Sequence, residues 1–333
     1  MTALGLAQIG FKPEVTYGTP VVVNRFLPFI SSNIEPEFGV VEASDELRAG
    51  SFVSRVDGQD PYVVGGGGTV KLFVPTKSFG LLLSHALGGA AIGSITDSNY
   101  TQTFTLSPTS KYGKSFTWQD CRPFNPSGTA QPFTWHGLKI LAIEFTLDEE
   151  GFLQCEIEVD CEDVDTSTAL EVASYASIAT GGAKFPWRLA TLAIASSNVE
   201  AKSFRCKITM PHNVDRRFIR GSHLKKEPNM NGKPVIDFDA ELEFTSLAQY
   251  NRMASTTIAG RIAEVKLTCD GVVALAGATV PRFELTIPAA RFDKGLPAIE
   301  GDEPLMQEVA GVGLDNLSDQ PITITYRTTD SAA

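Results

Sequence analysis

The chain has 333 residues, of which 43% are hydrophobic and 20% charged, and its formal net charge is −11. The length corresponds to about two domains of ~150 residues each, and the composition is that of a globular protein that buries a core. The acidic surplus excludes sequence-independent binding to nucleic-acid phosphates, because that binding depends on clustered Lys and Arg.

The cysteines and the N-terminal segment indicate synthesis in a reducing cytoplasm. The five cysteines are odd in number and include no Cys-x-x-Cys pair, which argues against a disulfide framework or a zinc site. The sequence does not open on a basic segment followed by an apolar run, so we expect no signal peptide. The longest apolar stretch, residues 79–93, is too short and too rich in glycine to span a bilayer, so we expect no membrane partner.

The first half is predicted to contain a long irregular segment followed by a helix. Residues 42–68 are mixed in charge and rich in Gly and Pro, and they end in Gly65–Gly68, which we interpret as a flexible strand entrance. The helix is expected over residues 76–88, with Thr76 or Ser78 as its N-cap. Its apolar stripe comprises Phe79, Leu82, Leu83 and Ala86.

A strand hairpin is expected next. Alternation with a period of two predicts half-buried strands over residues 139–148 and 152–163, joined by a Gly-containing turn at Asp148–Gly151. The predicted inward side chains are Leu141, Ile143, Phe145, Leu147, Leu153, Cys155, Ile157, Val159 and Cys161.

The second half repeats this mixture of strands, a helix and a long connection. A long irregular connection is expected at residues 211–234 and a helix over residues 245–254, with Leu247, Tyr250 and Ala254 on its apolar stripe. Strands are predicted near residues 202–210, 237–244, 263–270, 282–287 and 321–330. Their inward residues include Phe204, Cys206, Ile208, Met210, Ala263, Val265, Leu267, Cys269, Ile322, Ile324 and Tyr326.

Short segments recur about half a chain apart. Ser31–Glu35 (SSNIE) is echoed by Ser196–Glu200 (SSNVE), 165 positions later, and further matches follow at similar spacing. We interpret the echo as two diverged copies of one unit, and two unrelated β-domains with shared turn chemistry are the alternative. The units are placed at residues 1–165 and 186–333, with a linker at residues 166–185. The predicted fold class is mainly β (α+β): two tandem β-sandwich or barrel units, each with one packed helix and a long loop.

Motifs for catalysis and cofactor binding are missing from the sequence. The four histidines show no metal-ligand spacing, and the glycine run before Lys71 is followed by a strand pattern and not by the helix of a phosphate loop. No Gly-x-Ser-x-Gly elbow occurs. We therefore expect no catalytic residues, no metal and no cofactor, and a hydrolase stands only as a disfavoured alternative.

Several ordered segments resemble the tail tube (major tail) proteins of long-tailed bacteriophages. They are EVTYGTPVVVNRFLPF at residues 14–29, ELRAG at 46–50, VPTKSFGLLLSHALG at 74–88, PFTWHGLKI at 132–140, TIPAARFDKG at 286–295 and PITITYRTTD at 321–330. The likeness extends over nearly the whole chain. It implies two tail-tube-like units, a structural virion protein that is not an enzyme, and rings that stack into a hollow tube for genome delivery.

The resemblance also implies partners and a location. A duplicated subunit is expected to complete a pseudo-sixfold ring with three chains, and a hexamer is the alternative. Further expected partners are the tape measure protein in the lumen, the tail terminator and distal tail proteins at the ends, and genomic DNA that passes without tight binding. The implied place is the virion tail, assembled in the host bacterial cytoplasm. A β-sandwich binding or receptor-recognition virion protein without catalytic activity is the alternative function.

Two acidic ladders are the least expected feature of the predicted strands. Like charges in a row on one strand face repel, so stability alone does not favour them. We expect the two ladders to line the lumen and repel DNA, and a solvated outer surface is the alternative. The candidates are Glu156, Glu158, Asp160 and Glu162 in the first half, and Asp237, Asp239, Glu241 and Glu243 in the second.

The two long irregular segments are the expected contacts between rings. We predict that they are mobile in an isolated subunit and become ordered when rings stack. The candidate contact residues are Glu46, Arg48, Arg55, Asp57, Asp60, Arg216, Arg217, Lys225 and Lys226.

Overall fold

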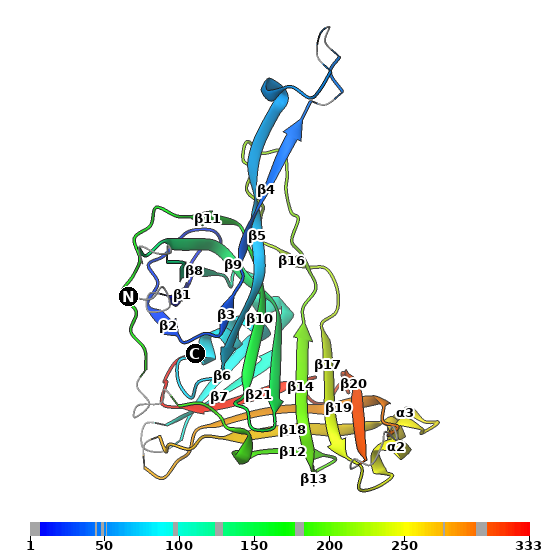
Figure 1. Ribbon diagram of the computed structural model, residues 1–333. Coiled ribbons are helices and arrows are strands. Elements are labelled where there is room, and N and C mark those ends of the chain that lie inside the picture. Colours follow the sequence, from blue (N-terminus) through cyan, green and yellow to red (C-terminus); the bar gives the residue numbers. More distant parts are fainter. Residues whose placement is uncertain are drawn as a thin grey trace.

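The computed structural model describes residues 7–333 except 44, 48–49, 51, 96–98, 124–128, 177–182, 276 and 298–304. About half of the described chain is β-strand, and its three α-helices are α1 (Gly80–Leu87), α2 (Ala248–Met253) and α3 (Ile258–Arg261). The predicted mainly β fold class is therefore confirmed. Figure 1 shows a body of crossing strands from which one long hairpin projects.

The central feature is an antiparallel sheet of eight strands drawn from both halves of the chain, which we call the long sheet. It begins with β4 (Glu35–Glu42), extended by the short β3 (Ser31–Ser32), and continues through β5 (Gln59–Phe73), β10 (Gln154–Cys161), β9 (Pro132–Asp148), β14 (Ala201–Thr209), β17 (Val235–Glu243), β20 (Met306–Gly313) and β19 (Arg282–Lys294). The step from β9 to β14 joins the two halves directly.

The remaining strands extend this sheet at its two long members. Around β9 lie β1 (Ile9–Pro13), β2 (Arg25–Leu27), β8 (Phe116–Cys121) and β11 (Asp163–Asp165), and around β19 lie β12 (Ala190–Ile194), β13 (Ser197–Val199) and β18 (Ile262–Asp270). The closing strand β21 (Thr323–Thr328) pairs with β19 and with β7 (Tyr100–Leu106), which forms a hairpin with β6 (Gly88–Ser94). A small separate pair consists of β15 (His212–Asn213) and β16 (Asn229–Met230).

The same chain of strand pairings occurs in each half. The pairings β1–β8, β8–β9, β9–β10, β10–β5 and β5–β4 have the counterparts β12–β18, β18–β19, β19–β20, β20–β17 and β17–β14. Ser31 pairs with Lys71 of β5, and Ser203 pairs with Glu241, the counterpart of Lys71 in β17. The strand pairings therefore align Ser31 with Ser203, 172 positions later. The SSNIE echo at 165 positions is therefore out of register, and Ser196–Glu200 lies at the β12–β13 hairpin. The unit boundaries inferred from the echo stay a prediction.

Alternation in the sequence correctly predicted the core. Every predicted inward residue of the strands is buried except the half-buried Leu141. The core is continuous between the halves, since Phe145 of β9 packs on Phe283 of β19 with ring centroids 5.0 Å apart. The linker is also packed, because the Glu171 amide donates to Gln119 Oε1 at 3.0 Å and Gln119 Nε2 donates to the Ala169 carbonyl at 3.0 Å.

Helices α1 and α2 occur where helices were predicted, although the cap of α1 differs, and α3 was not predicted. Helix α1 begins at Gly80 with Phe79 as N-cap and no capping side chain, because Ser78 adopts a positive φ of 67° and its amide donates to Asp330 at 2.5 Å. The predicted stripe of α1 is fully buried. In the second half, Leu247 is exposed, so the stripe predicted for residues 245–254 does not face the core.

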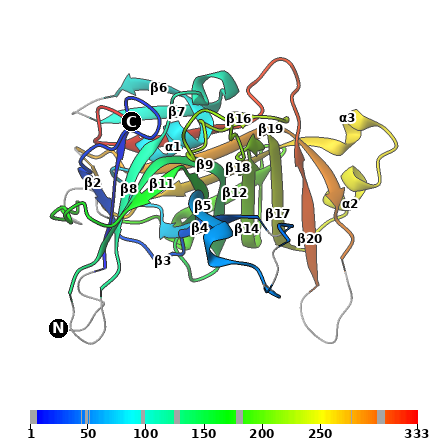
Figure 2. The ribbon, with the colours of Figure 1, turned by 90° about the horizontal axis from the view of Figure 1, so that it is seen from above.

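The segment predicted to be irregular, residues 42–68, is partly strand. β5 starts at Gln59 and pairs with β4 along its length, so the two strands form an extended hairpin, which we call the arm (Figures 1 and 2). The glycine run lies inside β5 and not at its entrance. Gly65 and Gly68 have φ of 121° and 157°, and a Cβ there would lie 2.6 Å from the Cys161 carbonyl oxygen and 2.5 Å from that of Asn33. Close approach of neighbouring backbone explains these glycines.

Candidate assembly surfaces

One face of the long sheet carries most of the acidic residues that were predicted to form the two ladders. Glu156, Glu158, Asp237, Asp239 and Glu241 lie on this face, as register and exposure show, with Glu243 exposed at its end. Cross-strand neighbours add Glu144, Asp148 and Glu308. Glu35 and Glu37 of β4 lie on the same face, so carboxylates occur across the whole width of the sheet.

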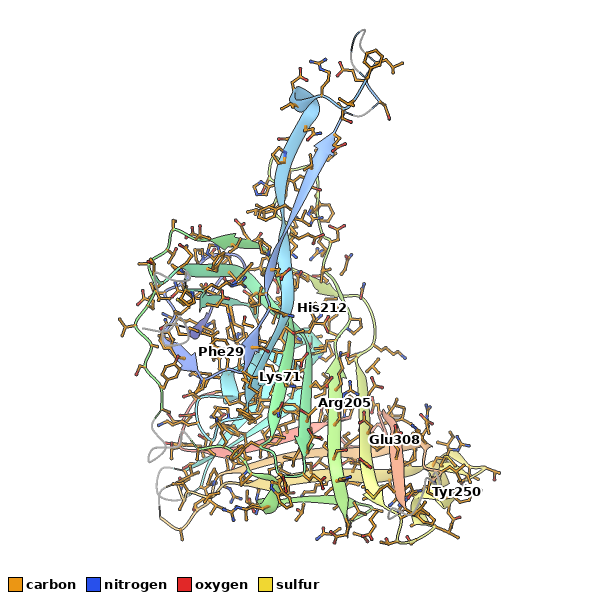
Figure 3. All side chains as sticks on the ribbon, in the orientation of Figure 1. Phe29, Lys71, Arg205, His212, Tyr250 and Glu308 are labelled. Atoms are coloured by element: carbon orange, nitrogen blue, oxygen red, sulfur yellow. The ribbon has the colours of Figure 1, made fainter. Side chains whose placement is uncertain are left out.

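Cations of β5, β14 and β19 interrupt this acidic face, and Lys294 of β19 pairs with Glu308. Arg205 and Lys207 of β14 lie between the two ladders, and Lys71 lies opposite Glu156 (Figure 3). The Arg205 guanidinium donates to both oxygens of Glu144 at 2.7 and 2.8 Å and to Asp239 at 2.9 Å. In the sequence, Arg205 and Lys207 alternate with the inward residues of their strand, and this pattern could have shown that they lie on the acidic face. The face is therefore mixed, and its carboxylates outnumber its cations.

Asp160 and Glu162 do not continue the exposed ladder, so their predicted outward exposure is wrong. Both are buried, because parts of the chain distant in sequence cover the end of β10. The residue 211–234 connection places the Lys225 ammonium on Asp160, and Glu162 lies beside Gly18. Burial raises the pKa of Asp160 to about 6, although the Lys225 ammonium acts against the rise.

The arm presents apolar side chains to solvent far from the body. Phe52 and Val56 near its tip are 98% and 93% exposed. The other large exposed apolar residues of the arm are Phe38, Val40, Val41, Leu47 and Val53. The composition of this segment is therefore less polar than the sequence interpretation assumed, and such a patch is typical of a surface that another protein covers.

The charged candidates of the arm lie around this apolar tip. Glu46, Asp57 and Asp60 are exposed, and Arg55 forms an ion pair with Asp57. Arg48 lies outside the described residues. The charged and apolar side chains together give the arm tip a mixed surface.

The second long connection is held against the first half, so the prediction that it is free is wrong for much of its length. Arg217 donates to the Val64 carbonyl of β5 at 2.6 Å, and Arg216 donates to Asn229 Oδ1 at 2.7 Å. Lys225 is only 4% exposed because of its ion pair with Asp160. Lys226 remains exposed, with its ammonium 5.2 Å from the centre of the Phe218 ring.

A second buried ion pair fixes the same connection. Lys139 of β9 pairs with Glu227, which also accepts a hydrogen bond from the Gly113 amide at 2.7 Å. Burial lowers the pKa of Lys139, and Glu227 opposes this shift. The sequence indicated neither pair, because the partners lie 65 and 88 positions apart.

The histidines pack in the protein as ordinary side chains. His85 of α1 is buried and stacks on Phe116 at 4.0 Å between ring centroids, and burial lowers the pKa of His85 to about 3. His212 lies close to the Met210 carbonyl, with 2.6 Å between Nδ1 and the oxygen. Among the residues that the structure describes, no group of His, Cys, Asp and Glu could hold a metal ion.

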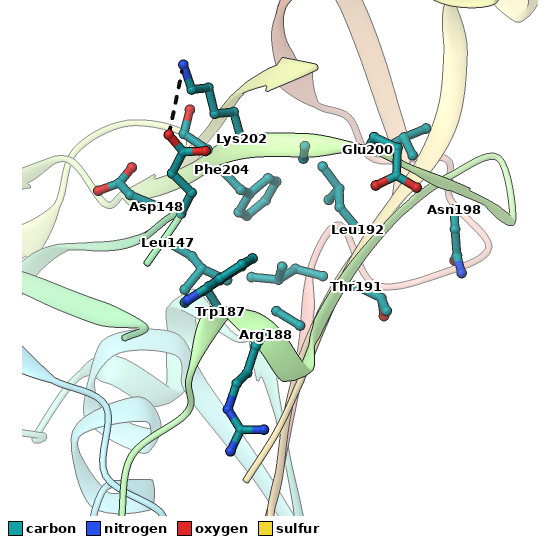
Figure 4. Close-up of a pocket in the computed structure, with 16 residues that line it drawn as sticks. Leu147, Asp148, Trp187, Arg188, Thr191, Leu192, Asn198, Glu200, Lys202 and Phe204 are labelled. Atoms are coloured by element: carbon teal, nitrogen blue, oxygen red, sulfur yellow. Dashed lines mark ion pairs between the residues drawn. The ribbon is translucent and has the colours of Figure 1, made fainter. Parts of the chain in front are cut away.

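An open cavity of about 270 Å³ lies where the linker enters the second half (Figure 4). Leu147, Leu192, Phe204 and Trp187 give it an apolar floor, and Lys202, 3.9 Å from Glu149, lies at its rim. Its strands β12, β13 and β14 end at the side of the body opposite the arm (Figure 1).

Within the described ranges, no helix is long and apolar enough to cross a membrane.

Comparison with models of known protein families gives a match. The model of a family described as phage tail tube protein matches residues 6–313, nearly the whole chain. A search of curated protein sequences finds no match. The family match ends before β21, the strand that joins the two halves a second time.

Lys225→Met is expected to lower the free energy of unfolding by about 3–5 kcal/mol, because Asp160 is left buried without its cation. The loss should be smaller at pH 5 than at pH 8, since protonation of Asp160 removes the stranded charge. Urea denaturation at both pH values measures this. Lys226→Met is the matched control, because Lys226 is adjacent and exposed. Equal, small effects of the two substitutions would show that the buried pair does not hold the connection.

Glu162→Gln is expected to flatten the dependence of stability on pH. Burial raises the pKa of Glu162 to about 7, and the neighbouring Glu14 carboxylate adds to the rise. The folded chain thus binds this proton more tightly than the unfolded chain, so the stability it contributes is present below pH 4.5 and is lost as pH rises through about 7. The unaltered protein should lose about 1–2 kcal/mol more than the variant between pH 4.5 and 8, after allowance for solvent screening. Parallel stability curves for the two proteins would contradict this.

Proposed function

We propose, for a chain that belongs to the phage tail tube protein family and is a structural protein of the virion tail, that three copies form each ring of the tube. The observation that carries this proposal is the strand order of the long sheet. The set β4, β5, β10, β9 is followed by its counterparts β14, β17, β20, β19 in the same order. One chain then supplies two quasi-equivalent units, and three chains complete a ring of six.

The charged face of the long sheet is proposed to line the lumen. Its carboxylates outnumber its cations, so the face, repeated in every ring, gives a wall with a negative surplus. Such a wall repels the phosphate backbone and lets DNA pass without adhering. The ion pairs of Arg205 with Glu144 and Asp239 relieve the repulsion between the ladders, which supports folding of a face that is still acidic overall.

The arm is proposed to bind the neighbouring ring, a second set of copies of this chain. It projects along one direction from the body, and its tip exposes Phe52 and Val56. The opposite end of the body offers the cavity floored by Leu192 and Phe204. An exposed apolar tip at one end and a cavity with an apolar floor at the other are suited to head-to-tail stacking.

The remaining partners follow from the place of a tail tube in the virion. A tape measure protein would occupy the lumen during assembly, and terminator and distal tail proteins would cap the ends, with assembly in the host cytoplasm. A purely structural role needs no catalytic group. Negative-stain microscopy of the purified protein tests the proposal: rings or filaments of uniform width support it, and a monodisperse monomer at high concentration contradicts it.

Phe52→Asp with Val56→Asp is expected to abolish tube formation and leave the fold intact, because burying two new carboxylates in an apolar contact is unfavourable. Circular dichroism and thermal melting should be unchanged, and microscopy should show no tubes. Val172→Asp is the control, since Val172 is 88% exposed on the linker and away from the arm. Normal tubes from the double variant would remove the arm from the ring contact.

Glu158→Lys with Glu241→Lys is expected to permit tubes but slow genome exit from tails, most strongly at low salt, where screening is weak. Reversing these two charges should leave the fold intact. The Glu158 carboxylate lies 3.9 Å from the Lys207 ammonium, which is a long ion pair, and Glu241 lies opposite the like-charged Glu308. Asp315→Lys with Asp319→Lys, outside the long sheet, is the control for net charge. DNA release timed at two salt concentrations measures the effect, and unchanged kinetics would contradict a lumen-facing position.

A further inference from the structure

We propose that adjacent chains of the ring join by strand pairing. Residues 294–297 of one chain, at and just after the end of β19, would lie antiparallel to residues 34–37 of the next chain. The inference deepens the proposed function and rests on its ring of chains. It assigns a partner, a second copy, to the open edge of β3 and β4. The observation behind it is that one chain already contains the same contact between its own halves.

The internal contact is the pairing of β9 with β14. It extends from Ala142 opposite Thr209 to Asp148 opposite Ser203. The Met210 amide donates to the Leu141 carbonyl at 2.9 Å, so the next pair, Ala142 with Thr209, is of the non-hydrogen-bonded kind. This contact connects the last strand of the first set to the first strand of the second set.

The register irregularities fix which residues correspond in the two sets. β10 and β9 pair Glu158 with Ala142 and then, after a bulge, Val159 with Ile140. β20 and β19 pair Ala310 with Lys294 and then, after a bulge, Gly311 with Phe292. The shift at Phe116/Trp118 likewise recurs at Ala263/Val265. Lys294 therefore corresponds to Ala142.

The first strand of the first set corresponds in the same way to β14. Ser31 pairs with Lys71 as Ser203 pairs with Glu241, which makes Glu37 the counterpart of Thr209. Replacing each member of the internal pair by its counterpart sets Lys294 of one chain opposite Glu37 of the next. The same substitution sets Leu296 opposite Glu35.

The edge that would receive β19 is open in the single chain. Among the described strands, β3 and β4 pair only with β5. The Asn33 amide donates to the Thr69 carbonyl at 3.0 Å, so the Ile34 amide and the Pro36 carbonyl point away from β5, while the Ile34 carbonyl accepts from Arg122. Phe38 is 68% exposed, whereas its counterpart Met210, beside β9, is 1% exposed. A neighbouring strand would supply the missing cover.

The charges of the proposed pair are complementary. The Lys294 ammonium is exposed on the charged face, where it pairs with Glu308 of its own chain, and Glu37 is exposed on the edge strand. Side chains of a non-hydrogen-bonded antiparallel pair approach closely, with Cβ atoms about 4.5–5.5 Å apart. One lysine would therefore contact carboxylates of two chains. The open edge is short, and Pro36 has no amide donor, so at this position it offers a neighbouring strand only its carbonyl.

Disulfide cross-linking tests the pairing. A chain with Glu37→Cys and Lys294→Cys is assembled under reducing conditions and then oxidised, and non-reducing electrophoresis counts the linked chains. The five native thiols are buried, and burial raises the pKa of Cys155, Cys161, Cys206 and Cys269, so they stay unreactive. We expect a ladder of one, two and three chains that stops at three, with most chains linked.

Leu296→Cys with Glu37→Cys is the matched control, because Leu296 is also exposed but lies two residues out of register with Glu37, where Cβ atoms about 7–8 Å apart are too distant for a disulfide. It should link less than a tenth as much. Tubes without the 37–294 link, or equal linking of the control, would overturn the pairing and leave the tube in place. A ladder that closes at six would support the pairing and overturn the three-chain ring. Absence of any ring from the unaltered protein would overturn both.

A charge exchange gives a second measurement should the cysteines disturb assembly. Lys294→Glu alone should prevent ring formation, and adding Glu37→Lys should restore it. Failure of the restoration, with both variants folded by circular dichroism, would overturn the proposed contact.

Discussion

The pairing of β9 with β14 is the constraint on which the rest of the molecule depends. Seven consecutive residue pairs, from Ala142 with Thr209 to Asp148 with Ser203, convert two four-strand sets into one sheet. Behind this seam, Phe145 packs on Phe283, so the halves also share their core. The relative orientation of the halves is therefore fixed by backbone hydrogen bonds and burial and not by a linker. A subunit with two rigidly related units is suited to building a ring in which the contact between units of adjacent chains repeats the contact within one chain.

Buried charges reinforce this arrangement from above the sheet. The connection from β14 to β17 belongs to the second half, yet its Lys225 and Glu227 pair with Asp160 and Lys139 of the first half. Such pairs add little net stability, but breaking one is costly because the remaining charge cannot be hydrated. They therefore act mainly on specificity, by holding the connection in one place beside the arm. The first half is incomplete without the second.

The sequence predicted what depends on local periodicity and missed what depends on distant contacts. Alternation identified the buried side of nearly every strand, including Cys206 and Ile324, because the pleat alone decides which side chains share a face. It could not reveal that Asp160, correctly placed on the side of Glu156 and Glu158, is covered by a segment 65 positions away. The arm was missed because glycine and proline are typical of loops, whereas Gly65 and Gly68 are needed in β5 for close backbone contact. The repeat was inferred from an echo in the wrong register, since strand pairing and not residue identity carries the correspondence of Ser31 with Ser203.

Image reconstruction of assembled tubes tests the central claim most directly, because it measures both the number of chains in a ring and the relation between their halves. We expect threefold symmetry, with the two halves of each chain at alternating, nearly equivalent positions and the face bearing Glu156 and Glu241 toward the lumen. A ring of six whole chains, or one in which the two halves occupy unrelated positions, would contradict it.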